Sequence, residues 1–176
     1  MFRLLFILLL TGILVFNTSF TFFWKKYKDY NDTIHHPRSW SIDKSVKLGT
    51  KFIFTSGLDS TTDTFQENIN LIIQDVSELD LSLKKFVEIT IQQIKTMLPN
   101  GKLLVNKRVR RGGPEFQRLI CTSTMNKSNM KFEQYCWVVQ QEAFILTFTC
   151  EESEYDKYRK TGQKILNSFV FNKKEL

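Results

Sequence analysis

The sequence predicts an α+β domain in which an antiparallel β-sheet is covered by helices. The expected elements follow the order strand, strand, helix, strand meander, helix, and the links within the meander are short and rich in turn-forming residues. Short links require antiparallel pairing, because a parallel pair of strands needs a long crossover connection. An antiparallel sheet of this kind needs helices over its apolar face or faces.

Two strands open the expected domain. Residues 51–55 read Lys-Phe-Ile-Phe-Thr, and residues 68–75 alternate, with Ile69, Leu71 and Ile73 on one side. A period of two is typical of a half-buried strand. The segment between them is rich in Gly, Asp, Ser and Thr, so we expect a loop there.

A first helix is expected to begin after Asp80 or Ser82, because either side chain can accept hydrogen bonds from the free amides of the first turn. The sequence Pro-Asn-Gly at residues 99–101 should end this helix. Apolar residues recur at three-to-four spacing and predict one buried stripe: Leu83, Phe86, Val87, Ile91, Ile94 and Leu98.

The meander and a second helix complete the expected domain. The strands are predicted at residues 102–111, 115–124, 130–139 and 143–150, with a turn at 126–129. The helix should start near Ser153, where Ser153 and Asp156 resemble a weak capping box. Its predicted apolar face consists of Tyr155, Tyr158, Ile165, Leu166 and Phe169.

The N-terminal segment, residues 1–24, is predicted to be either a signal peptide or a membrane anchor. Arg3 precedes an apolar run over residues 4–16, a polar break follows, and an aromatic cluster ends at Trp24. A positive start, an apolar core and a polar exit describe a signal peptide. The stretch 4–24 is also long enough to cross a bilayer, with an aromatic belt and lysines at the far interface. Both alternatives predict an exported protein, in the second case tethered to a membrane.

Residues 25–39 are polar and charged, show no useful periodicity and are predicted to be a tether. The folded domain is expected over residues 40–172. This length suits a single hydrophobic core.

The three cysteines, Cys121, Cys136 and Cys150, all fall in expected strands. The simplest interpretation is that they are small buried apolar residues. The alternative is a Cys121–Cys136 disulfide, because a turn at 126–129 would place these two nearly opposite each other on neighbouring strands.

The chain carries a formal net charge of +7, and its densest positive charge lies on one predicted strand and its hairpin tip. This cluster is a candidate docking patch for an acidic protein face or an anionic membrane surface. The alternative is a strand edge kept soluble by its charge. Nucleic acid is not expected, because aromatic residues do not alternate with the basic ones as stacking platforms would. The patch consists of Lys102, Lys107, Arg108, Arg110 and Arg111.

No catalytic, cofactor-binding or metal-binding residues are predicted. The two histidines, His35 and His36, are adjacent and fall in the expected tether, where a catalytic triad could not hold an imidazole rigidly. The chain has no zinc, phosphate-binding or dinucleotide motif. A loose acidic group does not have the spacing of a calcium-binding loop; it comprises Asp59, Asp63, Glu67 and Asp75.

Several segments together resemble the PsbP-like family, named for an extrinsic subunit of the photosystem II oxygen-evolving complex. The resemblance covers about residues 40–172, and its most specific pieces are Phe65–Leu71 and the closing Ile165–Phe169. The other matching segments are Gly49–Phe52, Phe132–Trp137 and Phe148–Glu152.

The resemblance implies an α/β/α sandwich, an exported or lumenal location, and a non-catalytic role in binding, stabilising or assembling a membrane-associated complex. It leaves two alternatives open. One is an extrinsic photosystem II subunit that supports calcium retention, although residues 25–39 are shorter than the basic extension of that subunit. The other is a small-ligand-binding module or an enzyme of unknown reaction.

Overall fold

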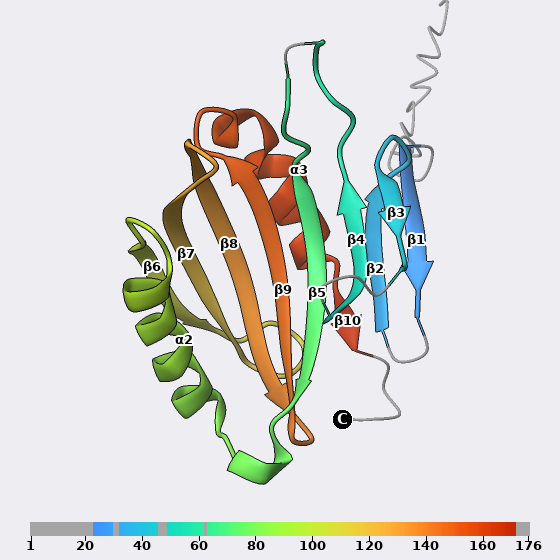
Figure 1. Ribbon diagram of the computed structural model, residues 1–176. Helices are drawn as coiled ribbons and strands as arrows, with labels where there is room; N and C mark the ends of the chain where they lie inside the picture. Colours follow the sequence, from blue (N-terminus) through green and yellow to red (C-terminus); the bar gives the residue numbers. More distant parts are fainter. Residues whose placement is uncertain (1–22, 30–31, 46–48, 62, 172–176) are drawn as a thin grey trace, which may run out of the picture.

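The computed structural model describes residues 23–29, 32–45, 49–61 and 63–171. Its main sheet is antiparallel throughout and has seven strands in the order β3-β4-β5-β9-β8-β7-β6 (Figure 1). The predicted α+β class is confirmed. The strands are β3 Ser41–Asp43, β4 Thr50–Thr55, β5 Asn68–Asp75, β6 Lys102–Val109, β7 Phe116–Met125, β8 Ser128–Val139 and β9 Glu142–Glu151.

One face of the sheet is covered by α2 (Leu83–Met97), which follows the short 3-10 helix η2 (Ser77–Leu79). Ser82 caps α2, because its Oγ accepts a hydrogen bond from the backbone N–H of Lys85. The predicted apolar stripe is confirmed: its six residues pack with strand residues such as Leu119 and Cys136 in one apolar cluster.

The opposite face is covered by α3 (Tyr155–Asn167), as Figure 1 shows. No side chain caps the N-terminus of α3, so the capping box expected from Ser153 and Asp156 does not form. The predicted apolar face is confirmed, since its residues lie in or against the larger core. Gly162 brings α3 close to the sheet: a Cβ at this position would lie 2.6 Å from the ring of Phe148.

Two-residue turns join the last three strands of the meander, β7, β8 and β9. Asn126 and Lys127 link β7 to β8, Gln140 and Gln141 link β8 to β9, and all four have positive φ angles. This backbone conformation matches the right-handed twist of the flanking strands, which makes tight hairpins possible.

The alternative interpretation, a Cys121–Cys136 disulfide, is wrong. The tight turn at 126–127 sets a register in which Cys121 lies opposite Phe132 and Cys136 lies opposite Gln117. The two cysteines are therefore offset by four residues along the hairpin. All three cysteines are free and buried, which agrees with the simpler interpretation.

A second, three-stranded sheet lies where the sequence predicts a polar tether. It has the order β1-β2-β10 and packs against the α3 side of the main sheet. Every second residue of β2 is buried, among them Ile34 and His36. This alternation cannot be recognised from polarity alone, because His36 is buried although it is a polar residue. The strands are β1 Trp24–Lys28, β2 Asp32–Pro37 and β10 Val170–Phe171.

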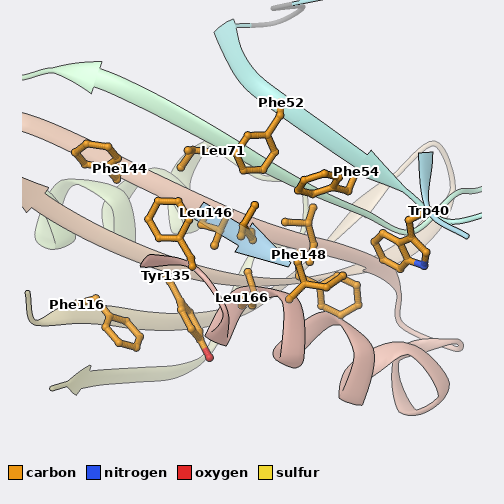
Figure 2. Packing of buried hydrophobic residues seen from close by; sticks show 14 of the residues in the cluster. Trp40, Phe52, Phe54, Leu71, Phe116, Tyr135, Phe144, Leu146, Phe148 and Leu166 are labelled. Atoms are coloured by element: carbon orange, nitrogen blue, oxygen red, sulfur yellow. The ribbon is translucent and has the colours of Figure 1, made fainter. Parts of the chain in front are cut away.

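The larger of the two apolar clusters fills the space between the main sheet, α3 and the small sheet. Figure 2 shows its aromatic residues, with Trp40 at one end and Phe116 beside Tyr135 at the other. Rings of β4 and β9 occupy the middle, and Phe52, Phe54 and Phe148 are fully buried there. The aromatic-rich composition is thus concentrated on one face of the sheet.

Within the described ranges, no helix is long and apolar enough to span a bilayer. The stretch 4–24, predicted to be a signal peptide or an anchor, lies outside the described residues except for Phe23 and Trp24. Trp24 begins β1.

Candidate docking site

The predicted basic patch lies on β6, which forms one edge of the main sheet, and on the link that joins β6 to β7. Lys107 and Arg108 lie near the end of β6, just before Val109, and Arg110 and Arg111 follow in the link. All four side chains are exposed, and we call them the basic cluster. Lys102 is also exposed but lies at the other end of β6, opposite Thr122. At about 3.3 Å per residue this places it roughly 17 Å away, outside the cluster.

The basic cluster keeps an excess of positive charge. Arg108 and Arg110 share one carboxylate, with nitrogen–oxygen distances to Glu115 of 3.5 and 3.1 Å. Lys107 and Arg111 make no ion pair within the described part of the chain. Since both partners of Glu115 are at the surface, these ion pairs contribute little to stability, and the free cations dominate the local potential.

A shallow hollow of about 460 Å³ lies beside the basic cluster, which we call the basic hollow. Five cationic side chains line it: the four of the basic cluster and Arg118 of β7. Phe116, Tyr135 and Gln163 also line it, so residues from β7, β8 and α3 meet the edge strand here.

Arg118 is held by a buried carboxylate that the sequence analysis did not single out. Glu133 of β8 is fully buried, and its Oε1 accepts a hydrogen bond of 2.7 Å from the Nε of Arg118. Its Oε2 accepts hydrogen bonds of 3.0 Å from the hydroxyl of Tyr155 and from Nε2 of Gln163. With all these partners the carboxylate is fully satisfied, which is what a buried charge requires.

The same network sets the charge of Arg118. Burial opposes the charge on this guanidinium, but the hydrogen bond and the charge of Glu133 outweigh burial and raise the pKa of Arg118. Burial and the charge of Glu133 also raise the pKa of the Tyr155 hydroxyl. Arg118 is therefore a fixed cation at the floor of the basic hollow. The sequence signal that could have indicated this network is Glu133 itself. It is a charged residue on the same buried face of its strand as Tyr135 and Trp137.

A second hollow of about 280 Å³ adjoins the first, and we call it the apolar hollow. Arg111, Phe116 and Tyr135 line both hollows. Most of the other lining side chains of the apolar hollow are apolar, and they come from the β6–β7 link, β8, the end of α3 and β10: Pro114, Trp137, Leu166, Phe169, Val170 and Phe171.

The histidines are not placed for catalysis. His36 is buried, stacks on Phe54 with ring centroids 4.4 Å apart, and has its Nδ1 2.9 Å from the carbonyl oxygen of Pro37. Burial lowers the pKa of His36. The backbone N–H of His35 donates to the Oγ of Ser168. The pair thus joins the small sheet to the core and to the end of α3, rather than lying in a solvated tether.

The three cysteines have low nucleophilic reactivity as well. Burial raises the pKa of Cys121 to about 11 and that of Cys136 to about 12. Burial and nearby carboxylates also raise the pKa of Cys150. A thiol acts as a nucleophile only as the thiolate, so these three are poor nucleophiles at neutral pH.

The four acidic residues noted in the sequence do not converge on one point. Asp59 bonds to the hydroxyl of Tyr158 and to Lys157, while Asp63 accepts backbone N–H groups of its own loop. Glu67 is buried against Ser56, and burial raises its pKa. Asp75 lies at the far end of β5. Among the described residues, no group of three or more His, Cys, Asp and Glu side chains could hold a metal ion.

Comparison with known proteins identifies the fold of this chain but does not assign the chain to a family. No protein-family model matches the chain, and no curated protein matches its sequence. Solved structures do match. The chain is similar to cyanobacterial PsbP (CyanoP) from Synechocystis sp. PCC 6803, with a TM-score of 0.62 and 13% identity over 84% of this chain and 92% of that one.

Two further structures share the fold at similar distance. LpqN of Mycobacterium tuberculosis matches with a TM-score of 0.61 and 12% identity over 85% of this chain and 90% of that one. Protein PA94 of Pseudomonas aeruginosa, of unknown function, matches with a TM-score of 0.59 and 15% identity over 84% and 96%. The chain therefore has a PsbP-like fold.

Proposed function

We propose that this protein is an exported, non-catalytic binding module that docks through its basic cluster to an acidic partner in a membrane-associated protein complex. The observation that carries the proposal is the basic cluster at the sheet edge, where Lys107 and Arg111 have no carboxylate partner among the described residues. Clustered cations of this kind attract acidic surfaces and speed their association.

The export and membrane parts of the proposal draw support from two directions. The N-terminal stretch 4–24 has the composition of a signal peptide or an anchor. LpqN, which shares the fold, is involved in cell envelope biogenesis, and CyanoP is a cyanobacterial PsbP. A role at a membrane-bound complex is consistent with both.

The non-catalytic part is supported by the arrangement of the reactive side chains. The thiols are buried, and burial raises the pKa of each of them. The ring of His36 lies against a backbone carbonyl and a stacked phenyl ring. A nucleophilic mechanism needs a nucleophile and a base within hydrogen-bond reach of each other. The described residues supply no such pair from His36 or the cysteines.

The proposal is tested by reversing charge in the basic cluster. A Lys107→Glu/Arg110→Glu variant should recover its main partner from crosslinked native membranes about tenfold less than the unmodified chain, because attraction becomes repulsion. A matched control is Lys84→Glu/Lys95→Glu, which makes the same charge change on the exposed side of α2. The control should recover the partner normally. Equal recovery by both variants would refute docking through the basic cluster.

A further inference from the structure

The two hollows beside the basic cluster form one continuous surface of mixed character. Arg111, Phe116 and Tyr135 line both, so the basic hollow and the apolar hollow meet along these three residues. Figure 2 shows Phe116 and Tyr135 side by side at one end of the core, and their ring centroids are 4.6 Å apart. A ligand that bridges the boundary must therefore have one charged end and one apolar end.

The basic side is built to bind an anion. Glu133 fixes Arg118 through Nε, and the two terminal nitrogens of that guanidinium make no hydrogen bond in the described part of the chain. A guanidinium that is already oriented loses less freedom when it binds a planar or tetrahedral anion. Lys107 and Arg111, which have no carboxylate partner among the described residues, add two more cations. Charge complementarity thus selects a carboxylate, phosphate or sulfate group.

The apolar side has the size of a short hydrocarbon segment. Its volume is about 280 Å³, close to the lower end of the roughly 300–1,000 Å³ that is typical of small-molecule sites. Val170 lines this hollow together with the buried Trp137 and Phe169 and is itself 56% exposed, so an apolar surface is open to solvent here. Concave, mostly apolar sites with a few placed polar groups are typical of small-molecule binding rather than of flat protein contacts.

We propose that the two hollows together bind a single-chain anionic amphiphile, with its acidic head group at Arg111 and Arg118 and the start of its acyl chain against Trp137 and Phe169. This inference goes beyond partner docking and assigns a ligand to the surface next to the basic cluster. Head and chain are recognised separately, so neither a neutral amphiphile nor a head group alone satisfies the site.

The test uses the full chain in nanodiscs of phosphatidylcholine, with lysophosphatidylglycerol that carries a photoactivatable group in its acyl chain. After irradiation, labelled residues are mapped by mass spectrometry. We expect labelling within residues 112–116 and 166–171, which contain most of the residues that line the apolar hollow. Unlabelled lysophosphatidylglycerol should compete about tenfold better than lysophosphatidylcholine, because only the former has a net negative head group. Glycerol 3-phosphate should not compete.

Two variants separate the parts of the site. Arg111→Gln should reduce labelling about tenfold by removing a cation from the head-group side. Val170→Asp should reduce it as strongly by placing a charge at the rim of the apolar hollow. Leu79→Asp makes the same kind of change at an exposed apolar residue of η2, away from both hollows, and should label normally.

Equal competition by the two lysolipids, or normal labelling of Val170→Asp, would overturn the proposal. Crosslinking of an acidic peptide to residues 112–116 without labelling by the lysolipid would also overturn it and assign the surface to a protein. Val170→Asp leaves the basic cluster intact, so it should still recover the membrane partner. Failure of this proposal is therefore distinguishable from failure of docking.

Discussion

At the level of single residues, the buried carboxylate of Glu133 connects the core to the basic hollow. It accepts hydrogen bonds from β7 through Arg118 and from α3 through Tyr155 and Gln163. A lone charge at this depth would be costly, but each oxygen has a partner, and one partner carries the opposite charge. The Glu133 carboxylate therefore holds α3 against the sheet and also orients Arg118.

Replacing Glu133 by Gln should destabilise the protein by about 3 kcal/mol, because Arg118 then loses its partner in a largely buried place. The free energy of unfolding in urea measures this loss. Glu142→Gln, at an exposed position at the start of β9, should change it by less than about 0.5 kcal/mol. Arg118→Met added to Glu133→Gln should recover part of the loss, and no recovery would argue against coupling between the two side chains.

The buried His36 should make the folded protein less stable in mild acid than at neutral pH. Burial lowers its pKa below the ordinary value of 6.5, so near and below that pH the unfolded state binds more protons than the folded state. Stability is then lost as the pH falls through 6.5 towards the lower pKa of the folded state. Burial raises the pKa of Glu67, so this group acts in the opposite sense above its ordinary value of 4.5.

A His36→Phe variant keeps an aromatic ring against Phe54 and removes the titrating group. Between about pH 7.5 and pH 5.5 it should lose less unfolding free energy than the unmodified chain. Urea unfolding of both proteins at the two pH values measures the difference. An identical loss in both proteins would show that His36 does not carry the acid sensitivity.

At the level of elements, close approach of α3 to the sheet depends on the absence of a side chain at one position. Gly162 is buried within α3, and a Cβ there would lie 2.6 Å from Cδ1 and Cε1 of Phe148. Phe148 is fully buried, so its ring has little room to move. Glycine normally weakens a helix, and its presence here has a packing reason.

Gly162→Ala should therefore destabilise the protein by about 1–3 kcal/mol, although alanine favours a helix by ~1 kcal/mol over glycine. Thermal or urea unfolding detects the sign. Gly57→Ala is the matched control, because a Cβ at that loop position meets nothing within 4 Å. A stabilised Gly162→Ala variant would mean that α3 can shift away from Phe148 at little cost.

At the level of the whole molecule, the sequence predicted α2, α3 and the strands of the main sheet other than β3, because their signals are local. Period-two alternation in β5 and the stripe of α2 are visible without any partner. The small sheet was missed for two reasons. β1 and β2 pair as a local hairpin, but the buried His36 is polar, so polarity alone does not reveal the alternation of β2. β10 has only two residues and is a strand because it pairs with β2, more than 130 positions away.

The candidate site was predicted only in part for a similar reason. Charge density identified the basic cluster, but it also included Lys102, which the length of β6 places at the far end of the strand. Arg118, Tyr135 and Gln163 reach the same hollow from three other elements. Only the register of β6, β7 and β8 and the position of α3 bring them together. A local pattern carries no information about such convergence.

If the basic cluster is the surface that meets the membrane-associated partner, a crosslinker placed in it should capture that partner. Site-specific photocrosslinking measures this, with benzoylphenylalanine in place of Lys107 in one chain and of Lys84 in another, both exposed lysines. We expect one dominant crosslinked protein from position 107 and none from position 84. The same product from both positions, or a product from position 84 alone, would contradict it.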